Sequence, residues 1–102
     1  MSDYPQSMDE VAALMRDNVP PGLSPSEFGR KLKWGRGNDG ARERMKTLTR
    51  RELEEIGLNV QMALNWAKAY EAVAQIMPDN PSAAGRTELM RHAAGLLQGD
   101  DR

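Results

Sequence analysis

The sequence predicts an all-α fold, a small irregular or orthogonal bundle of five to six helices. Helix-capping residues recur ahead of the apolar segments, and apolar residues within these segments repeat every three to four positions. No stretch of useful length alternates between apolar and polar residues as a half-buried strand would. With 102 residues, the chain is long enough for one hydrophobic core and too short for two ordinary domains.

The first helix is predicted near the N-terminus. Ser7 and Glu10 have the spacing of a capping box, in which side chains accept hydrogen bonds from unpaired backbone N–H groups. The apolar positions that follow fall on one helical face, and two adjacent prolines within residues 18–22 end the helix. The N-terminal segment is therefore expected to carry a short amphipathic helix.

The second helix has the most complete start signal in the chain. Ser24 fits the N-cap, Pro25 fits the first helical position, and Glu27 completes another capping box. We expect this helix to run to Trp34 and to stop at Gly35, since glycine commonly terminates helices.

A glycine-rich loop with the sequence Gly-Arg-Gly-Asn-Asp-Gly separates the second helix from the third. Within it, Asn38 and Asp39 are alternative caps for the third helix. A short fourth helix begins at a capping box formed by Thr49 and Glu52, and Gly57 is expected to end it in a left-handed conformation.

Two longer helices complete the prediction. Asn59 caps a fifth helix that is expected to run to Met77, and its wide apolar stripe indicates a central position in the bundle. The sixth helix begins either at Asn80 with Pro81 or at Ser82. These elements divide the chain into an N-terminal extension with a short amphipathic helix at 1–23, a single helical domain at 24–98, and a tail at 99–102.

The composition excludes several classes of protein. The chain has no cysteine, so it forms no disulfide, thiol nucleophile or cysteine zinc site, and this suits a reducing cytosol. No apolar run approaches the roughly 18–20 residues that a membrane span needs. Residues 1–7 lack the basic start and the apolar stretch of a signal peptide. We therefore expect a cytoplasmic protein without a membrane span, and we predict no cofactor.

Positive charge is unevenly distributed, although the net charge is only −1. Residues 24–51 contain nine Lys or Arg and three Asp or Glu, whereas the flanking parts are acidic. One interpretation is an electrostatic footprint for phosphate, and the other is pairing with surface carboxylates that contributes little stability. Both stay open. The candidate nucleic-acid contacts are Arg30, Lys31, Lys33, Arg42, Arg44, Lys46, Arg50 and Arg51.

The candidate catalytic side chains are few. His92 is the only histidine, and Glu88 lies four residues before it on the same face of the sixth helix. The two are either a general acid–base pair or a solvated surface pair, and the second is the commoner meaning of this spacing. No second ligand sits at metal-binding spacing, so we predict no metal site. Whether the protein is an enzyme stays open.

A helix-turn-helix is a second possible functional unit. Residues 49–66 form a short helix, a glycine turn and the start of a long helix. The second of these helices has no Lys or Arg before Lys68, and phosphate contacts require cations. A purely structural helix-turn-helix is therefore favoured over one that reads DNA.

Three stretches of sequence carry a resemblance to a known family. They are Phe28-Gly29 with Trp34-Gly35-Arg36-Gly37 and Ala41-Arg42; Leu48-Thr49-Arg50-Arg51-Glu52-Leu53 with Gly57; and Asn80-Pro81-Ser82-Ala83-Ala84-Gly85-Arg86 with Leu89-Met90. Together they resemble an uncharacterised helical domain found at the C-terminal ends of bacterial polymorphic-toxin and effector-type proteins. The resemblance covers residues 24–97 and implies a role in, or beside, an effector delivered to another cell by a secretion system.

The resemblance also directs attention to two loops. Arg36 and Arg86 each follow a glycine, which permits a close backbone approach, and arginine can hold phosphate or carboxylate with two hydrogen bonds. The glycine-rich loop precedes a helix N-terminus but lacks the ending of a P-loop, and Trp34 is either a core anchor or a stacking platform. The ligand-binding candidates are Trp34, Arg36, Asn38, Arg42 and Arg86.

Three hypotheses about function follow. The first is a bacterial effector- or toxin-associated domain of unknown activity that acts on nucleic acid or another phosphate-bearing target. The second is a helix-turn-helix-like nucleic-acid-binding regulator. The third is a non-catalytic protein-interaction module, such as an adaptor or an immunity-type partner. The partner is accordingly a nucleic acid, another protein or a second copy of the chain.

Overall fold

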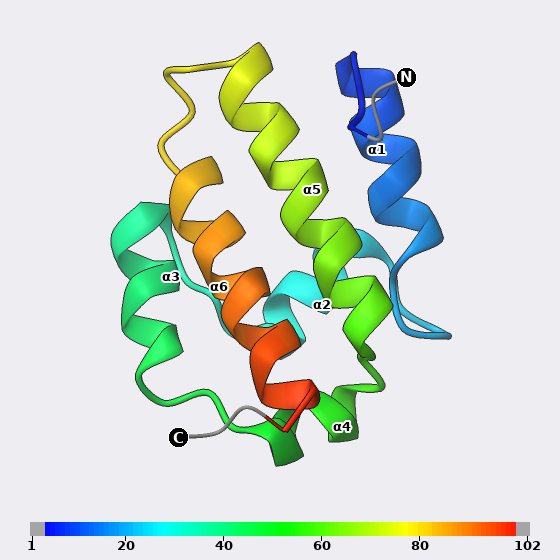
Figure 1. The fold of residues 1–102 in the computed structure, drawn as a ribbon, viewed down its shortest axis with the longest axis vertical. Coiled ribbons are helices and arrows are strands. Elements are labelled where there is room, and N and C mark those ends of the chain that lie inside the picture. Colours follow the sequence, from blue (N-terminus) through cyan, green and yellow to red (C-terminus); the bar gives the residue numbers. More distant parts are fainter. Residues whose placement is uncertain (1–3, 100–102) are drawn as a thin grey trace.

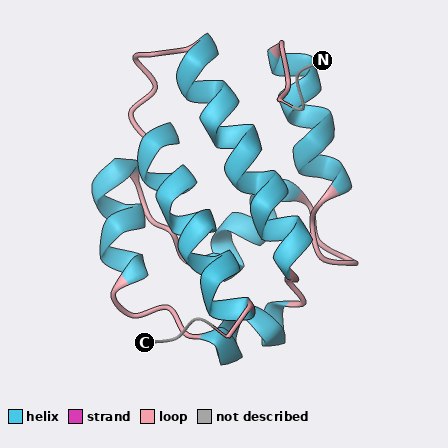
Figure 2. Cartoon of the chain, in the orientation of Figure 1, coloured by secondary structure: helices cyan, strands magenta, loops and turns pink. Residues whose placement is uncertain are grey.

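The structure is a computed structural model that describes residues 4–99, and its regular secondary structure there is entirely helical (Figure 2). The six helices are α1 (Met8–Asp17), α2 (Pro25–Leu32), α3 (Gly37–Met45), α4 (Arg50–Ile56), α5 (Val60–Ile76) and α6 (Ala83–Leu97). The predicted all-α fold is confirmed. Apart from Gly99, the predicted tail at 99–102 lies outside the described residues. No helix in the described part is long and apolar enough to cross a membrane.

Four helices lie side by side and two run across them. Figure 1 shows α1, α5, α6 and α3 next to one another in that order, and each neighbouring pair is in contact. The two shorter helices have other directions: α2 passes behind α5 and α6, and α4 closes the lower end of the bundle. The bundle is therefore irregular, as predicted, with α5 between α1 and α6.

The predicted starts of α1, α2 and α4 form through local hydrogen bonds. Complete capping boxes are present at Ser24 with Glu27 and at Thr49 with Glu52. At α1 the Ser7 hydroxyl accepts the expected hydrogen bond from the Glu10 N–H at 3.2 Å. These contacts span three residues, so they depend only on the neighbouring sequence.

The end of α2 differs from its prediction. The helix stops at Leu32 and not at Trp34, because Lys33 adopts a left-handed conformation with φ of 60°. This reversal carries Trp34 back across α2, where its indole ring lies against Gly29. A Cβ atom at Gly29 would lie only 2.7 Å from Cζ2 of the indole, so the glycine makes room for the ring.

The glycine-rich stretch also differs from its prediction. Its last four residues belong to α3, which begins at Gly37 with Arg36 as N-cap, so neither Asn38 nor Asp39 caps the helix. The Asn38 side chain instead accepts a hydrogen bond from the Gly85 N–H at 2.7 Å. Its own N–H donates to the carbonyl of Pro81 at 2.9 Å. The start of α3 is therefore held by contacts to the segment that leads into α6.

The start of α6 combines the two predicted alternatives. The helix begins at Ala83, with Ser82 at the N-cap position but without a hydrogen bond from its hydroxyl. The Asn80 side chain accepts hydrogen bonds from the N–H groups of Ser82 and Ala83 at 2.9 and 3.0 Å. The asparagine therefore satisfies backbone donors that the serine leaves unpaired.

An aromatic cluster forms the centre of the core. It contains four of the five aromatic residues of the chain: Phe28, Trp34, Trp66 and Tyr70. The ring of Trp66 lies 4.8 Å from that of Phe28 and 5.9 Å from that of Trp34, measured between centroids. Its indole N–H donates to the carbonyl of Asn18 at 3.0 Å, which ties the end of α1 to this core.

Candidate anion-binding pocket

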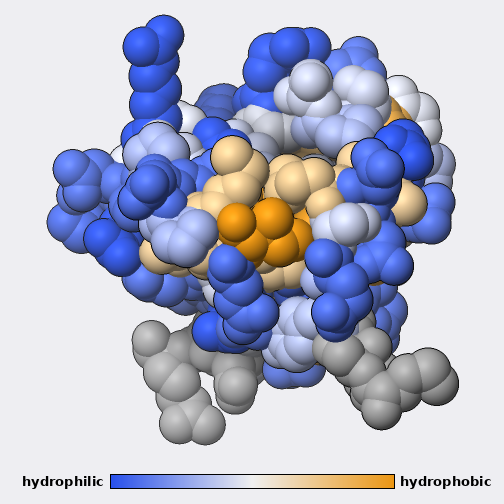
Figure 3. Space-filling model, turned by 90° about the horizontal axis from the view of Figure 1, so that it is seen from above, coloured by the Kyte–Doolittle hydropathy of each residue, from blue (hydrophilic) through white to orange (hydrophobic). Residues whose placement is uncertain are grey.

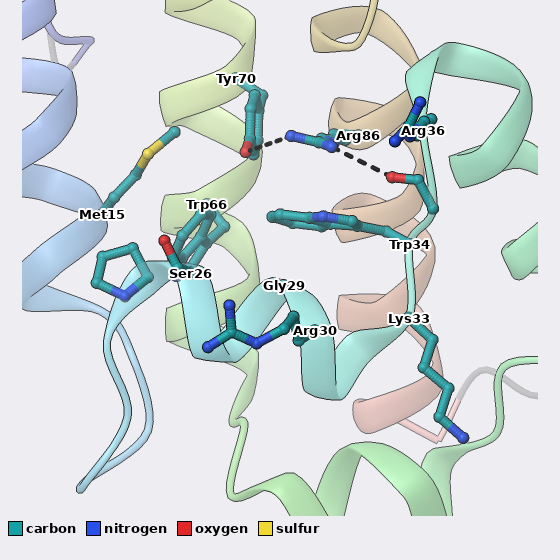
Figure 4. A pocket seen from close by; sticks show the side chains of 12 residues that line it. Met15, Ser26, Gly29, Arg30, Lys33, Trp34, Arg36, Trp66, Tyr70 and Arg86 are labelled. Atoms are coloured by element: carbon teal, nitrogen blue, oxygen red, sulfur yellow. Dashed lines mark hydrogen bonds between the residues drawn. The ribbon is translucent and has the colours of Figure 1, made fainter.

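A pocket of about 540 Å³ opens beside the aromatic cluster. Figure 4 shows that it lies between the last turn of α1, the first turns of α2 and the connector from α2 to α3, with α5 and α6 behind. Its volume falls in the range of small-molecule sites. The lining residues are Met15, Pro25, Ser26, Gly29, Arg30, Lys33, Trp34, Gly35, Arg36, Trp66, Tyr70 and Arg86.

Arg86 lines the pocket and contacts two of its aromatic rings. Its guanidinium carbon lies 4.3 Å from the ring centroid of Trp34 and 5.6 Å from that of Tyr70, which are cation–π distances. One terminal nitrogen donates to the Tyr70 hydroxyl at 3.2 Å, and the other donates to the carbonyl of Gly35 at 3.3 Å. Both hydrogen bonds are drawn in Figure 4. The guanidinium group is thus held in one place by contacts from two segments of the chain, residues 34–35 and α5.

The positive charge of Arg86 has no counter-ion among residues 4–99. None of the ion pairs found there includes this residue. Its Nε atom is buried and lacks a hydrogen-bond partner in the same part of the chain. A guanidinium group has five N–H donors, and only two hydrogen bonds are made by this one. The positive charge of Arg86 therefore remains unpaired at the pocket.

The other charged residues that line the pocket are also positive. They are Arg30, Lys33 and Arg36, and the lining contains no Asp or Glu from the described residues. In Figure 4, Arg36 lies on the same side as Arg86, Arg30 lies near Ser26, and Lys33 points away from the pocket. A concave surface with several cations and no carboxylate attracts anions.

Tyr70 adds a neutral hydrogen-bond donor. Burial raises the pKa of its hydroxyl above the ordinary value of 10.0, an effect that the nearby Arg86 opposes. The phenol is therefore protonated at neutral pH. Because its oxygen accepts a hydrogen bond from Arg86, its proton is directed elsewhere and is available to a ligand.

The two arginine-bearing loops of the sequence meet at this pocket. Gly35 accepts a hydrogen bond from Arg86, although the two residues are 51 positions apart. A Cβ atom at Gly85 would lie 2.6 Å from Cα of Asn38, so the glycine lets α6 approach α3 closely. Two of the three stretches that carry the family resemblance thus build one structural unit.

A comparison with known protein families identifies the family of the chain. Residues 4–97 match the family model described as Domain of unknown function (DUF4951). The chain belongs to the DUF4951 family. No curated protein and no solved structure matches the chain. The predicted likeness to an uncharacterised domain is confirmed, whereas the link to toxins and effectors and the placement at C-terminal ends stay predictions.

The predicted ligand-binding residues of this DUF4951 domain separate into two groups. Trp34, Arg36 and Arg86 line the pocket. Asn38 and Arg42 lie instead at a neighbouring hollow of about 360 Å³, which also includes Arg36. Asn38 is engaged with Gly85 and Pro81, as described above, and Arg42 is engaged with Glu88.

The predicted nucleic-acid contacts also separate into two groups. Five of the eight form ion pairs, which are Arg42–Glu88, Arg44–Glu52, Lys46–Glu43, Arg50–Glu54 and Arg51–Glu55. The remaining three, Arg30, Lys31 and Lys33, belong to α2 and its C-cap, and none of them is ion-paired within the described residues. Two of these unpaired cations, Arg30 and Lys33, line the pocket.

The candidate catalytic pair has a different arrangement from an acid–base couple. The carboxylate of Glu88 accepts two hydrogen bonds from Arg42, at 3.2 and 2.9 Å, which lower its pKa below the ordinary value. No hydrogen bond joins it to His92 in the described structure. Among residues 4–99, no group of three His, Asp or Glu side chains is placed to hold a metal ion.

The possible helix-turn-helix is formed by α4, the left-handed Gly57 and α5. Its second helix packs between α1 and α6. Near its N-terminus, Gln61 and Asn65 are hydrogen-bonded to each other, and Asn65 also donates to Asn18. DNA reading by this unit stays a prediction.

The sequence predicts some of the residues that line the pocket but not the others. No motif in the sequence singles out Tyr70, although its position four residues after Trp66 places both rings on one helical face. Met15 and Ser26 carried no signal, because their contribution depends on the position of α1 relative to α2. The absence of a carboxylate near Arg86 is likewise a property of the folded chain.

A separate apolar patch lies at the upper end of the bundle. Figure 3 views this end from above and shows apolar side chains gathered at the centre, with hydrophilic residues around them. Large exposed apolar residues near this end are Tyr4, Met8, Ile76 and Met77. Oligomerisation of the DUF4951 domain stays a prediction.

Proposed function

We propose that this DUF4951 domain binds a phosphate-bearing ligand in the pocket beside Trp34, with Arg86 as its principal contact. The observation that carries the proposal is the unpaired charge of Arg86, a half-buried side chain that lines the pocket without an ion pair in the described residues. A partly buried charge is less well solvated than one in water, so a counter-ion that accepts its hydrogen bonds stabilises it. A bound anion supplies that counter-ion.

The donors around the pocket suit a phosphate group. Arg86 provides its unused N–H groups, and the Tyr70 hydroxyl provides a further donor beside them. Arg36 and Arg30 supply additional positive charge at the rim. A phosphate monoester carries close to two negative charges and three acceptor oxygens, so it can use more of these groups than a carboxylate can.

The aromatic residues have a supporting role in this proposal. Trp34 is only 9% exposed, and Arg86 covers one face of its ring. Little aromatic surface is therefore left for a ligand ring to stack upon. Trp34 holds the guanidinium group in position, and the ligand is recognised through its charge.

Titration with inorganic phosphate, followed by two-dimensional NMR, tests the proposal. Phosphate should shift the indole N–H signal of Trp34 and the amide signals of Gly35 and Arg86 in a saturable manner. Arg86→Met should weaken this binding at least about tenfold, because hydrogen bonds to charged groups contribute roughly 1.5–3 kcal/mol.

Arg50→Met is the matched control. Arg50 is ion-paired with Glu54 and does not line the pocket, so this variant should bind phosphate as the wild type does. The amide spectra of both variants must show the native fold. Equal phosphate binding by folded Arg86→Met and wild-type protein would contradict the proposal, as would shifts spread over the whole surface.

A further inference from the structure

A second feature beside the pocket bears on the source of the phosphate. The unpaired cations of the described chain are concentrated on one surface. Seven Lys and Arg residues there form no ion pair, and five of them belong to this surface: Arg30, Lys31, Lys33, Arg36 and Arg86. The other two are Arg16 and Lys68. We call Arg30, Lys31 and Lys33 the α2 basic surface. It borders the pocket directly, because Arg30 and Lys33 line both the pocket and a neighbouring hollow of about 310 Å³ that includes Lys31.

The acidic residues near this surface are already engaged. Glu27 completes the capping box of α2, where its carboxylate accepts a hydrogen bond from the Ser24 N–H at 2.9 Å. On the other side, Glu52 is paired with Arg44, and Glu55 is paired with Arg51. The α2 basic surface therefore keeps a positive potential that neighbouring carboxylates only partly offset.

The α2 basic surface extends from the rim of the pocket away from Arg86. Arg30 lies at the rim, and Lys33 extends from the rim away from Arg86 (Figure 4). A ligand with one phosphate would use the pocket and leave this surface free. A ligand with several phosphates in a row would use both.

We propose that the ligand is the phosphorylated end of a nucleic-acid strand, an inference that rests on the function proposed above. The terminal phosphate occupies the pocket at Arg86, and the next phosphodiesters contact the α2 basic surface. A terminal phosphate is a monoester, which carries more charge than an internal phosphodiester and is unobstructed on one side. A concave site with unpaired positive charge therefore favours the end of a strand over its interior.

Binding of this kind does not depend on base sequence. Phosphate contacts give affinity without base readout, and sequence-independent binding of single strands usually adds aromatic stacking. Here the rings of Trp34, Trp66 and Tyr70 are buried, so stacking contributes little. The expected complex has modest affinity and a strong dependence on salt.

Fluorescence anisotropy with a short single-stranded oligonucleotide tests the inference. The label is placed at the 3′ end, and the 5′ end carries either a phosphate or a hydroxyl; a second pair of strands reverses the two ends. Wild-type protein should bind the phosphorylated strand of one or both pairs at least about tenfold more tightly. The folded Arg86→Met variant should bind both forms of a strand equally.

The variant Lys31→Gln tests the contribution of the α2 basic surface. It should weaken binding of both forms of the strand and flatten the dependence of log Kd on log salt by about 0.7, which is the contribution of one contact to a single strand. Because Lys31 does not line the pocket, binding of inorganic phosphate should be unchanged. Lys46→Gln is the matched control, because Lys46 is paired with Glu43 and lies outside both surfaces.

The outcomes separate the two proposals. If inorganic phosphate binds at Arg86 but terminal phosphates give no preference, the pocket function stands and this inference is wrong. The inference is also wrong if a mononucleotide or a phosphopeptide binds as tightly as the phosphorylated strand, because the following phosphodiesters then contribute nothing. If inorganic phosphate does not bind at Arg86, both proposals are wrong.

Discussion

The basic stretch at residues 24–51 has two halves, residues 30–36 and residues 42–51. Both are rich in Lys and Arg, but they differ in whether these cations form ion pairs. From residue 42 to residue 51, every Lys and Arg faces a carboxylate at 2.8 to 3.6 Å. From residue 30 to residue 36, none of the four cations is ion-paired within the described chain. A cluster of positive charge in the sequence therefore becomes a positive surface only where its cations form no ion pairs with the carboxylates that lie near them.

The halves also differ in what holds them in place. Arg44 is the central contact of the second half: its side chain is only 11% exposed, and it donates to the Leu32 carbonyl, the Thr47 hydroxyl and the Glu52 carboxylate. The first half has no ion pair within the described chain, and it accepts hydrogen bonds at two backbone carbonyls, that of Leu32 from Arg44 and that of Gly35 from Arg86. Apolar packing also holds it, because Trp34 and the preceding Phe28 pack against Trp66.

The largest effect is expected in the half that is held by ion pairs. Arg44→Met should lower the free energy of unfolding by about 2–3 kcal/mol, because it leaves the Leu32 carbonyl and the Glu52 carboxylate without their donor. Urea unfolding followed by circular dichroism measures the change. Arg50→Met, which removes an exposed pair with Glu54, is the control and should cost about 0.3 kcal/mol. Equal losses would show that Arg44 is no more than a surface residue.

A smaller effect is expected in the half that is held by packing. In Gly29→Ala, the new Cβ would lie 2.7 Å from the Trp34 indole, and this ring is too enclosed to move freely. Overpacking costs about 1–3 kcal/mol, and the better helix propensity of alanine returns up to about 1 kcal/mol. We therefore expect a net loss of about 1.5 kcal/mol, together with weaker phosphate binding.

Exposed Ser26, on the same helix, provides the control for this variant. Ser26→Ala should change the free energy of unfolding by less than about 0.5 kcal/mol. Tryptophan fluorescence should change in Gly29→Ala and not in Ser26→Ala. Unchanged fluorescence and stability in Gly29→Ala would place the Trp34 ring away from α2.

This contrast also explains which parts of the structure could be predicted. The starts of α2 and α4 depend on residues three positions apart, so their capping boxes could be identified from the sequence. The end of α2 depends on Trp34 packing against Gly29, and the start of α3 depends on a hydrogen bond between Asn38 and Gly85, 47 residues away. Local patterns contain no information about a contact over 47 residues. The packing of Trp34 on Gly29 spans only five residues, but it follows none of the capping patterns that mark helix ends.

The candidate site also has some residues that could be predicted from the sequence and some properties that could not. Trp34, Arg36 and Arg86 could be singled out because glycine-flanked arginines and isolated tryptophans are recognisable residue by residue. The sequence could not indicate which cations stay unpaired. Arg42, which was expected to bind a ligand, is neutralised by Glu88 from a helix 46 residues further along the chain. The properties that make the pocket positive are therefore properties of tertiary structure.

The smallest expected effect concerns the pH dependence of the paired half. The hydrogen bond from Arg44 is the first cause of the lowered pKa of Glu52, whose ordinary value is 4.5. A carboxyl group with a lowered pKa in the folded state stabilises the fold above its unfolded-state pKa, and this contribution is lost as the pH falls through the lowered value. Because the side chain is 37% exposed, water screens the pair, and we expect only about 0.5 kcal/mol. The difference in unfolding free energy between wild type and Glu52→Gln should therefore be present at pH 6 and shrink towards pH 3. Lys31→Gln, in the half without ion pairs, is the control, and its difference from the wild type in unfolding free energy should not shrink as the pH falls. A pH-independent difference for Glu52→Gln would indicate that the ion pair contributes no stability.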